Sequence, residues 1–89
     1  MNDKISVILP TYNRANLLKK AIESVLSQSY LNWELIIINN SSVDNTLEVI
    51  EKFKSDNIKV INTNNNGILA KSKNIGIKNS EGKWIAFLD

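Results

Sequence analysis

The stretch that decides the fold is Ile5-Ser6-Val7-Ile8-Leu9-Pro10-Thr11-Tyr12-Asn13-Arg14. Its first part has the length of a strand, and a run that is apolar on both faces is typical of a central strand in a parallel sheet covered by helices. Pro10 has no N–H to donate, so we place it at the carboxyl end of this strand. Ligands of open α/β sheets bind at that end, which predicts that Thr11, Tyr12 and Asn13 face a ligand crevice. The alternative is an ordinary strand-to-helix loop in which Asn13 caps the next helix.

Length and composition restrict the kind of protein that this chain can be. Its 89 residues suffice for one domain, and 43% hydrophobic with 22% charged residues is an ordinary globular balance. A net charge of +2, with scattered lysines and glutamates, argues against a nucleic-acid surface. The absence of cysteine and histidine excludes disulfides, thiolate metal sites and a Ser-His-Asp triad. Because we find no signal peptide and no apolar run of ~20 residues, we expect a cytoplasmic α/β domain.

Amphipathic segments alternate with apolar runs along the rest of the chain. The pattern predicts helices over residues 15–26, 44–53 and 68–78, and further strands over 33–38, 58–62 and 83–88. The predicted inward positions of the first helix are Leu17, Leu18, Ala21, Ile22, Val25 and Leu26. Those of the other two helices are Leu47, Ile50, Phe53, Ala70 and Ile77. Trp33 and Trp84 begin strands, so we assign them to core or rim packing.

The order of elements is β-α-β-α-β-α-β, with helices long enough for right-handed crossovers between parallel strands. The predicted fold is a Rossmann-like α/β unit with a parallel sheet of order 3-2-1-4, in which the strand over 58–62 is an edge. That order places residues 10–12, Asn39, Asn40 and Asp89 along one carboxyl edge. Neither G-x-G-x-x-G nor a P-loop lysine motif follows the first strand, which argues against a nicotinamide or kinase-type site.

Several ordered motifs resemble family 2 glycosyltransferases, which are inverting enzymes with a GT-A fold that use nucleotide-diphosphate sugars. Residues 7–14 (VILPTYNR) are similar to the opening motif of the family, and residues 21–28 followed by 33–37 are similar to its first helix and second strand. Residues 39–46 (NNSSVDNT) stand where the family usually has an acidic turn. The resemblance covers the whole chain.

Two later segments extend the resemblance. Asn66-Gly67 followed by Ser72-Lys73-Asn74-Ile75-Gly76 matches the Gly…Ala-Arg-Asn-x-Gly segment of the family. Gly82-Lys83-Trp84-Ile85-Ala86-Phe87-Leu88-Asp89 matches the strand that leads into the Asp-x-Asp metal motif.

The resemblance implies a role for each matching residue. Pro10, Thr11 and Tyr12 would line the nucleobase pocket. Asn39 and Asn40 would replace the acidic base contacts, losing the charge-assisted part of that hydrogen bond but keeping the ability to donate and accept. Two further cofactor-binding positions are implied, Lys73 in place of an arginine near the diphosphate and Asp89 for ribose and a divalent cation, Mn²⁺ or Mg²⁺. The implied donor is a UDP-sugar.

The second aspartate of the metal motif, the general base and the acceptor-binding part are not in these 89 residues. We therefore expect residues 1–89 to be the N-terminal nucleotide-sugar-binding part of a glycosyltransferase that is inactive alone. The complete enzyme would transfer sugar to a glycan or lipid-linked acceptor for cell-wall or capsule polysaccharide, with any membrane association made by the missing parts. One alternative is a non-catalytic module, either a residual nucleotide binder or a folded remnant with no ligand. Another is a response-regulator-like domain, which needs an acidic cluster that Pro10-Thr11 does not provide.

Overall fold

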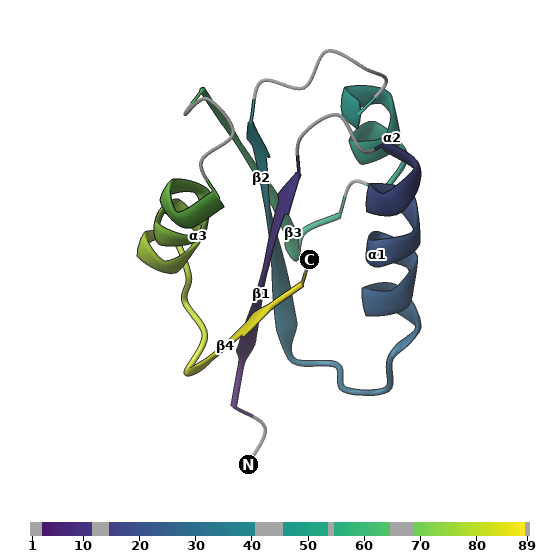
Figure 1. Cartoon of the computed structure of the whole chain (residues 1–89). Helices are drawn as coiled ribbons and strands as arrows, with labels where there is room; N and C mark the ends of the chain where they lie inside the picture. Colours follow the sequence, from purple (N-terminus) through teal and green to yellow (C-terminus); the bar gives the residue numbers. More distant parts are fainter. Residues whose placement is uncertain (1–2, 12–14, 41–45, 54, 65–68, 89) are drawn as a thin grey trace.

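The computed structural model describes residues 3–11, 15–40, 46–53, 55–64 and 69–88. Within these ranges four strands alternate with three helices (Figure 1). In chain order the elements are β1 (Ile5–Thr11), α1 (Ala15–Ser27), β2 (Trp33–Asn40), α2 (Thr46–Lys52), β3 (Ile58–Thr63), α3 (Leu69–Lys78) and β4 (Trp84–Phe87). None of these helices is long and apolar enough to cross a membrane.

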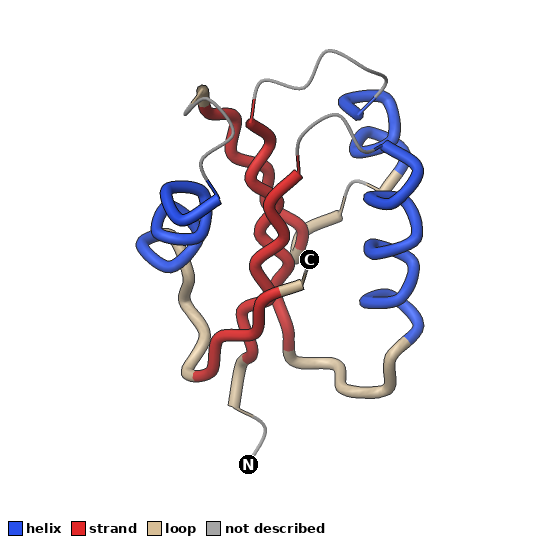
Figure 2. Tube along the Cα trace, viewed as in Figure 1, coloured by secondary structure: helices blue, strands red, loops and turns tan. Residues whose placement is uncertain are grey.

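The strands form one parallel sheet of order β3-β2-β1-β4, which confirms the predicted topology (Figure 2). β1 and β2 are the central pair and run in register from Ile5↔Trp33 to Thr11↔Asn39. β3 pairs with the later part of β2, and β4 pairs with the first part of β1. The predicted edge position of β3 is therefore correct, and β4 forms the other edge.

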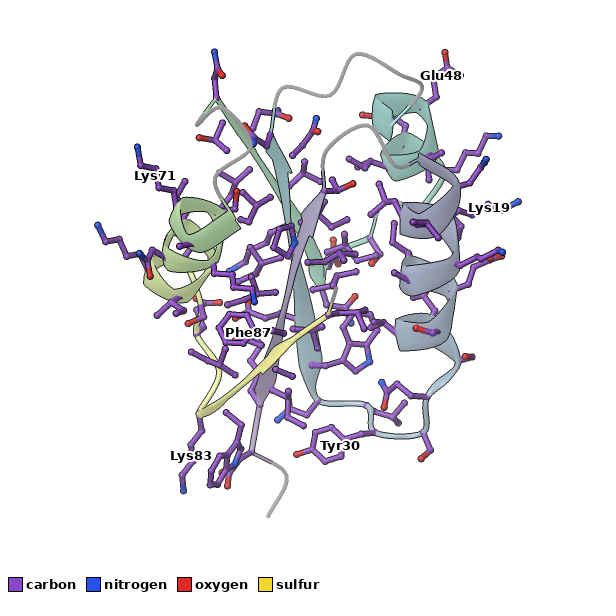
Figure 3. All side chains as sticks on the ribbon, viewed as in Figure 1. Lys19, Tyr30, Glu48, Lys71, Lys83 and Phe87 are labelled. Atoms are coloured by element: carbon purple, nitrogen blue, oxygen red, sulfur yellow. The ribbon has the colours of Figure 1, made fainter. Side chains whose placement is uncertain are left out.

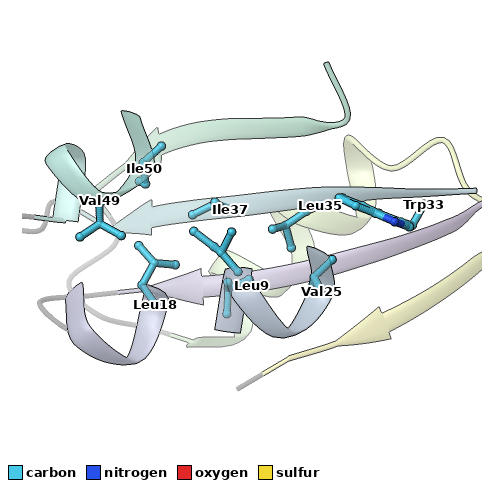
Figure 4. Close-up of a cluster of buried hydrophobic side chains, with 9 residues drawn as sticks. Leu9, Leu18, Val25, Trp33, Leu35, Ile37, Val49 and Ile50 are labelled. Atoms are coloured by element: carbon cyan, nitrogen blue, oxygen red, sulfur yellow. The ribbon is translucent and has the colours of Figure 1, made fainter. Parts of the chain in front are cut away.

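Helices cover both faces of the sheet, α1 and α2 on one face and α3 on the other (Figure 1). All eight residues of β2 are buried, as expected for a central strand in this arrangement. The larger core cluster lies between the sheet and α1 with α2 (Figure 4). Its buried members are Leu9, Leu18, Ile22, Val25, Trp33, Leu35, Ile37, Val49 and Ile50. A smaller cluster of Ile8, Ile36 and Ile38 lies beneath α3, with Ile61 and Ile75 packed against it.

The predicted inward face of α3 is wrong. Ala70 is exposed and Ile77 is 41% exposed, whereas Ser72 and Gly76 are buried. The helix is turned so that its smallest side chains face β1, and a Cβ built on Gly76 would lie 2.5 Å from Cγ2 of Ile8. Apolar periodicity could not find this face, because the residues that allow the close approach are not apolar.

The buried stripe of α1 is narrower than predicted. Leu18, Ile22 and Val25 are buried, but Leu17 and Leu26 are exposed. In the second helical segment Ile50 is buried as predicted, and Phe53 packs against the same cluster just beyond the end of α2. Trp33 joins the core and Trp84 lies exposed at the rim, which agrees with the packing predicted for them.

Candidate functional site

Polar residues end the three longer strands at one edge of the sheet. Thr11 of β1 pairs in register with Asn39 of β2, and Asn39 pairs with Asn62 of β3. These three residues form a row across the carboxyl edge, the position at which open α/β sheets bind ligands. Pro10 and Asn40 occupy neighbouring positions in the same two central strands. The structure thus brings together four of the seven predicted site residues.

Strand alternation divides this edge between the two faces of the sheet. Thr11 and Asn39 follow Leu9 and Ile37 at intervals of two residues, so they belong to the face covered by α1 and α2. Asn40 follows Ile38 in the same way and belongs to the α3 face. The adjacent asparagines of β2 therefore lie on different faces of the sheet, and Asn39 shares its face with Thr11.

Asn39 carries an unpartnered acceptor. Its residue is 3% exposed, and its Nδ2 donates to Oδ1 of Asn62 over 3.1 Å. This bond turns Oδ1 of Asn39 away from Asn62, and that buried oxygen accepts no hydrogen bond from any residue that the structure describes. An unsatisfied buried acceptor costs on the order of 1–3 kcal/mol, so such groups commonly mark a position that an external donor completes.

Lys73 lies elsewhere in the fold. It is half-buried on α3, and its Nζ is 5.0 Å from the centroid of the Phe87 ring of β4. Figure 3 shows Phe87 on the α3 side of the sheet, where its ring meets the helix, and Lys71 of the same helix pointing outward. A cation over an aromatic face within about 6 Å is held electrostatically. Lys73 is therefore positioned by β4, the strand that leads to Asp89.

Tyr12, Asn13 and Asp89 lie outside the described residues, as does the turn at 41–45. Among the residues that are described, no three acidic side chains gather into a group that could hold a metal ion. The carboxylate predicted to bind a metal ion belongs to Asp89, which lies outside these residues.

Sequence reasoning missed Asn62 and Glu34. Asn62 could have been found by comparing strand ends, because β3 ends on polar residues in register with those of β2. Glu34 is 1% exposed and lies at the opposite, amino-terminal edge of the sheet. A lone glutamate inside an apolar strand was the available signal, since carboxylates are almost never fully buried without partners.

One carboxylate oxygen of Glu34 accepts two hydrogen bonds, and the other forms an ion pair with a lysine. Oε2 accepts hydrogen bonds from Ser6 Oγ at 2.6 Å and from the Glu81 amide at 2.6 Å. Oε1 lies 3.0 Å from Nζ of Lys59. Burial raises the pKa of this carboxyl, but the hydrogen bonds from Ser6 and Glu81 and the pairing with Lys59 outweigh burial and lower the pKa from 4.5 to about 2. The carboxylate is therefore charged at neutral pH.

A parallel sheet of order 3-2-1-4 with helices on both faces is a Rossmann-like α/β unit, whose ligand sites lie at the carboxyl edge of the sheet. The sequence profile of glycosyl transferase family 2 matches residues 6–89, and the chain belongs to this family. Its fold is the GT-A fold of these enzymes.

Relatives by sequence are glycosyltransferases. The chain is 47% identical over 87 residues to an uncharacterized glycosyltransferase of Rickettsia bellii, with 97% of this chain and 12% of that protein covered. It is 36% identical over 85 residues to the Escherichia coli UDP-Glc:alpha-D-GlcNAc-diphosphoundecaprenol beta-1,3-glucosyltransferase WfgD, with 96% of this chain and 34% of WfgD covered. The chain thus spans only a fraction of the length of these relatives.

A solved structure shows the same fold with a nucleotide present. Residues 1–349 of Staphylococcus aureus TarS, crystallised in complex with UDP, superpose with a TM-score of 0.90 at 32% sequence identity. The superposition covers 97% of this chain and 27% of the TarS chain.

Proposed function

We propose that residues 1–89 form the N-terminal donor-binding part of a glycosyltransferase and bind the nucleotide of a UDP-sugar at the carboxyl edge of the sheet. The observation that carries this proposal is the buried, unpartnered Oδ1 of Asn39 in register with Thr11. An imino N–H of uracil is a donor of the kind that this oxygen lacks. The UDP complex of TarS and the UDP-Glc donor in the name of WfgD support this nucleotide.

The other site residues are assigned to different parts of the donor nucleotide. Pro10, Thr11 and Tyr12 line the base pocket, with the Tyr12 ring available for stacking. Asn40 serves the base from the α3 face of the sheet. Lys73, already held over Phe87, adds positive charge towards the diphosphate.

Asp89 serves ribose and a divalent cation, Mn²⁺ or Mg²⁺. Mg²⁺ is usually bound by one or two carboxylates together with substrate phosphates, so a single aspartate with a nucleotide diphosphate is a reasonable part of such a site. The cation, when bound, would neutralise the charge that develops on the leaving diphosphate.

The proposed reaction of the whole protein is inverting transfer to a glycan or lipid-linked acceptor. It needs a general base that deprotonates the acceptor hydroxyl, and we assign that base to the part of the enzyme beyond these residues. The 89-residue chain alone is therefore proposed to bind donor without turnover. A nucleotide-binding module without catalysis is the second candidate, favoured by the amides Asn39 and Asn40 in place of carboxylates.

A titration of the ¹⁵N-labelled chain with UDP and CDP tests the proposal. UDP should shift the amide resonances of Thr11, Asn39 and Asn62 and leave those at the amino edge unchanged, with an affinity weaker than micromolar and little change on adding Mn²⁺ or chelator. CDP, which has an acceptor where UDP has the imino N–H, should bind more weakly by roughly tenfold, the value of about one hydrogen bond. The variant Asn39→Leu should lose this preference, while the exposed Asn64→Leu should keep it.

Shifts confined to another part of the sheet, or no shifts at millimolar UDP, would show that the carboxyl edge is not a nucleotide site. Submicromolar affinity, or loss of binding on chelation, would contradict the role given to the missing part of the enzyme.

A further inference from the structure

The amino-terminal edge of the sheet holds a buried polar cluster that connects β4 to the other three strands. Glu34 of β2 is its centre, Ser6 of β1 and Lys59 of β3 are its partners, and the turn at residues 81–82 leads directly into β4. This cluster lies at the opposite end of the strands from the candidate nucleotide site. The proposed function gives it no role.

The cluster accepts hydrogen bonds from two successive peptide N–H groups of the turn before β4. The Glu81 amide donates to Oε2 of Glu34 at 2.6 Å, and the Gly82 amide donates to Ser6 Oγ at 2.8 Å. Ser6 Oγ in turn donates to the same Oε2 at 2.6 Å, so the carboxylate receives both connections. The next amide, that of Lys83, donates to the Lys4 carbonyl at 2.9 Å and begins the pairing with β1.

Gly82 shows how closely the turn is held. A Cβ at this position would lie 2.5 Å from Ser6 Oγ, 2.7 Å from the Ser6 nitrogen and 2.8 Å from the Lys4 carbonyl oxygen. Two of these three atoms belong to the backbone and cannot rotate away. Only glycine therefore allows the turn to lie against β1 at this distance.

Among the residues that the structure describes, β4 is otherwise held mainly by its pairing with β1 and by the contact of Lys73 with Phe87. It is a four-residue edge strand, all four of its residues are exposed, and Trp84 is 59% exposed. Short edge strands with little burial are the parts of a sheet that open first. Side chains alternate along a strand, so a shift of one residue in β4 would also exchange the residues on its two faces.

The charges around Glu34 favour its ionised form. Lys59, 40% exposed, pairs with Oε1, and it also bonds Glu81, which lies 3.6 Å from Lys4. On the same face, the nearby helix α3 carries Lys73, whose charge lies over Phe87. A neutral carboxyl would lose the charge-assisted part of the bonds from Ser6 and the Glu81 amide.

We propose that Glu34 is a latch: its buried carboxylate holds the 81–82 turn on the sheet, fixes the register of β4, and releases β4 as a unit when the carboxylate is neutralised. If the proposed function holds, the latch also acts on the donor site, because only Leu88 separates β4 from Asp89 in the sequence. Glu34 is then a positioning residue for the donor site, which it does not contact.

Hydrogen exchange of the 89-residue chain tests the latch without any nucleotide. In Glu34→Gln, which keeps the size of the side chain and removes its charge, the amides of Lys83, Trp84 and Leu88 should exchange at least about tenfold faster, in line with the loss of charge-assisted bonds. The amide of Leu35, bonded to Asn57, should change much less because β2 stays in the core. Glu23→Gln, the same change at an exposed position of α1, is the matched control and should leave all of these rates unchanged.

Two further measurements keep the test decisive if Glu34→Gln does not fold. Ser6→Ala removes both hydrogen bonds of Ser6 Oγ, the one to Glu34 and the one from the Gly82 amide, but keeps the charge of Glu34, and it should accelerate the same three amides. In the unaltered chain, opening of β4, corrected for the intrinsic pH dependence of exchange, should increase as the pH falls below 4 while β2 stays protected. Equal acceleration of β2 and β4 in these experiments, or no acceleration of β4, overturns the latch. Either result is independent of nucleotide binding and leaves the proposed function standing.

Discussion

Replacement of Gly76 by alanine should destabilise the protein, although alanine is the better helix former. Gly76 lies inside α3, where the exchange alone would raise the free energy of unfolding by about 1 kcal/mol. The new methyl, however, would lie 2.5 Å from Cγ2 of Ile8 and 3.0 Å from its Cγ1. Ile8 is fully buried and β-branched, so its side chain has little freedom to move aside.

Overpacking of this kind costs typically about 1–3 kcal/mol, and the rigid neighbour places Gly76→Ala near the upper end of that range. After the gain in helix propensity is subtracted, the free energy of unfolding should fall by about 1–2 kcal/mol. For a domain of this size that lowers Tm by roughly 5–10 °C. Urea unfolding followed by circular dichroism measures the free energy, and a thermal scan measures Tm.

Two variants separate the clash from helix propensity. Asn74→Ala, at an exposed position of the same helix, gains propensity without a clash and should stabilise by a few tenths of a kcal/mol. Ile8→Ala removes the atoms that the new methyl would meet, so Gly76→Ala should cost much less in that background, a coupling of about 1–3 kcal/mol. If Gly76→Ala instead stabilises the unaltered protein as Asn74→Ala does, α3 does not approach β1 as closely as described.

Three other results are expected. Because the pKa of Glu34 is lowered from 4.5 to about 2 on folding, the unfolded chain binds more protons, and about 3 kcal/mol of stability present above pH 4.5 should be lost as the pH falls towards 2. Urea unfolding at a series of pH values checks this, and Glu34→Gln should show a correspondingly smaller dependence. Asn40→Asp should keep the preference for UDP over CDP in a calorimetric titration, because the uracil N–H is assigned to Oδ1 of Asn39 on the other face of the sheet, and loss of the preference would mean that Asn40 binds that N–H. In a chain extended by the acceptor-binding part of a relative, Asp89→Ala should reduce metal-dependent turnover far more than Lys73→Ala, which removes a screened charge worth about 1 kcal/mol; equal losses would show that the diphosphate is misplaced.

The sequence predicted the sheet because its central strands carry clear runs of apolar residues. Residues 35–38 of β2 are four consecutive large apolar residues, and such a run fits only a strand buried on both faces once its length is considered. The carboxyl edge followed from topology, since parallel strands all end on the same side. The sequence therefore predicts that Thr11 and Asn39 lie together, and their register confirms it.

What the sequence could not supply was packing that depends on small or polar residues. Gly76 and Ser72 face the sheet because α3 lies close to β1, and closeness between elements distant in the chain leaves no periodic signal. Glu34 presents the same difficulty, because its partners come from positions 6, 59 and 81, each on a different segment. Only the folded sheet brings these residues within bonding distance.

Glu34 and Asn39 lie at the two polar ends of the same buried strand, β2. Glu34 and Asn39 are five residue steps apart along the extended chain, about 16 Å at the usual rise per residue, and the four side chains between them are fully buried. A closely packed strand transmits a change of register along its whole length, because its side chains cannot exchange faces without emptying the core. β4 pairs with β1 in parallel register over four residues, so a bond at the amino edge that fixes this register also fixes where β4 ends. Release of that bond should be detectable at Leu88, whose amide is bonded to Ile8 at 3.0 Å, even though Glu34 lies near the other end of the strand pair.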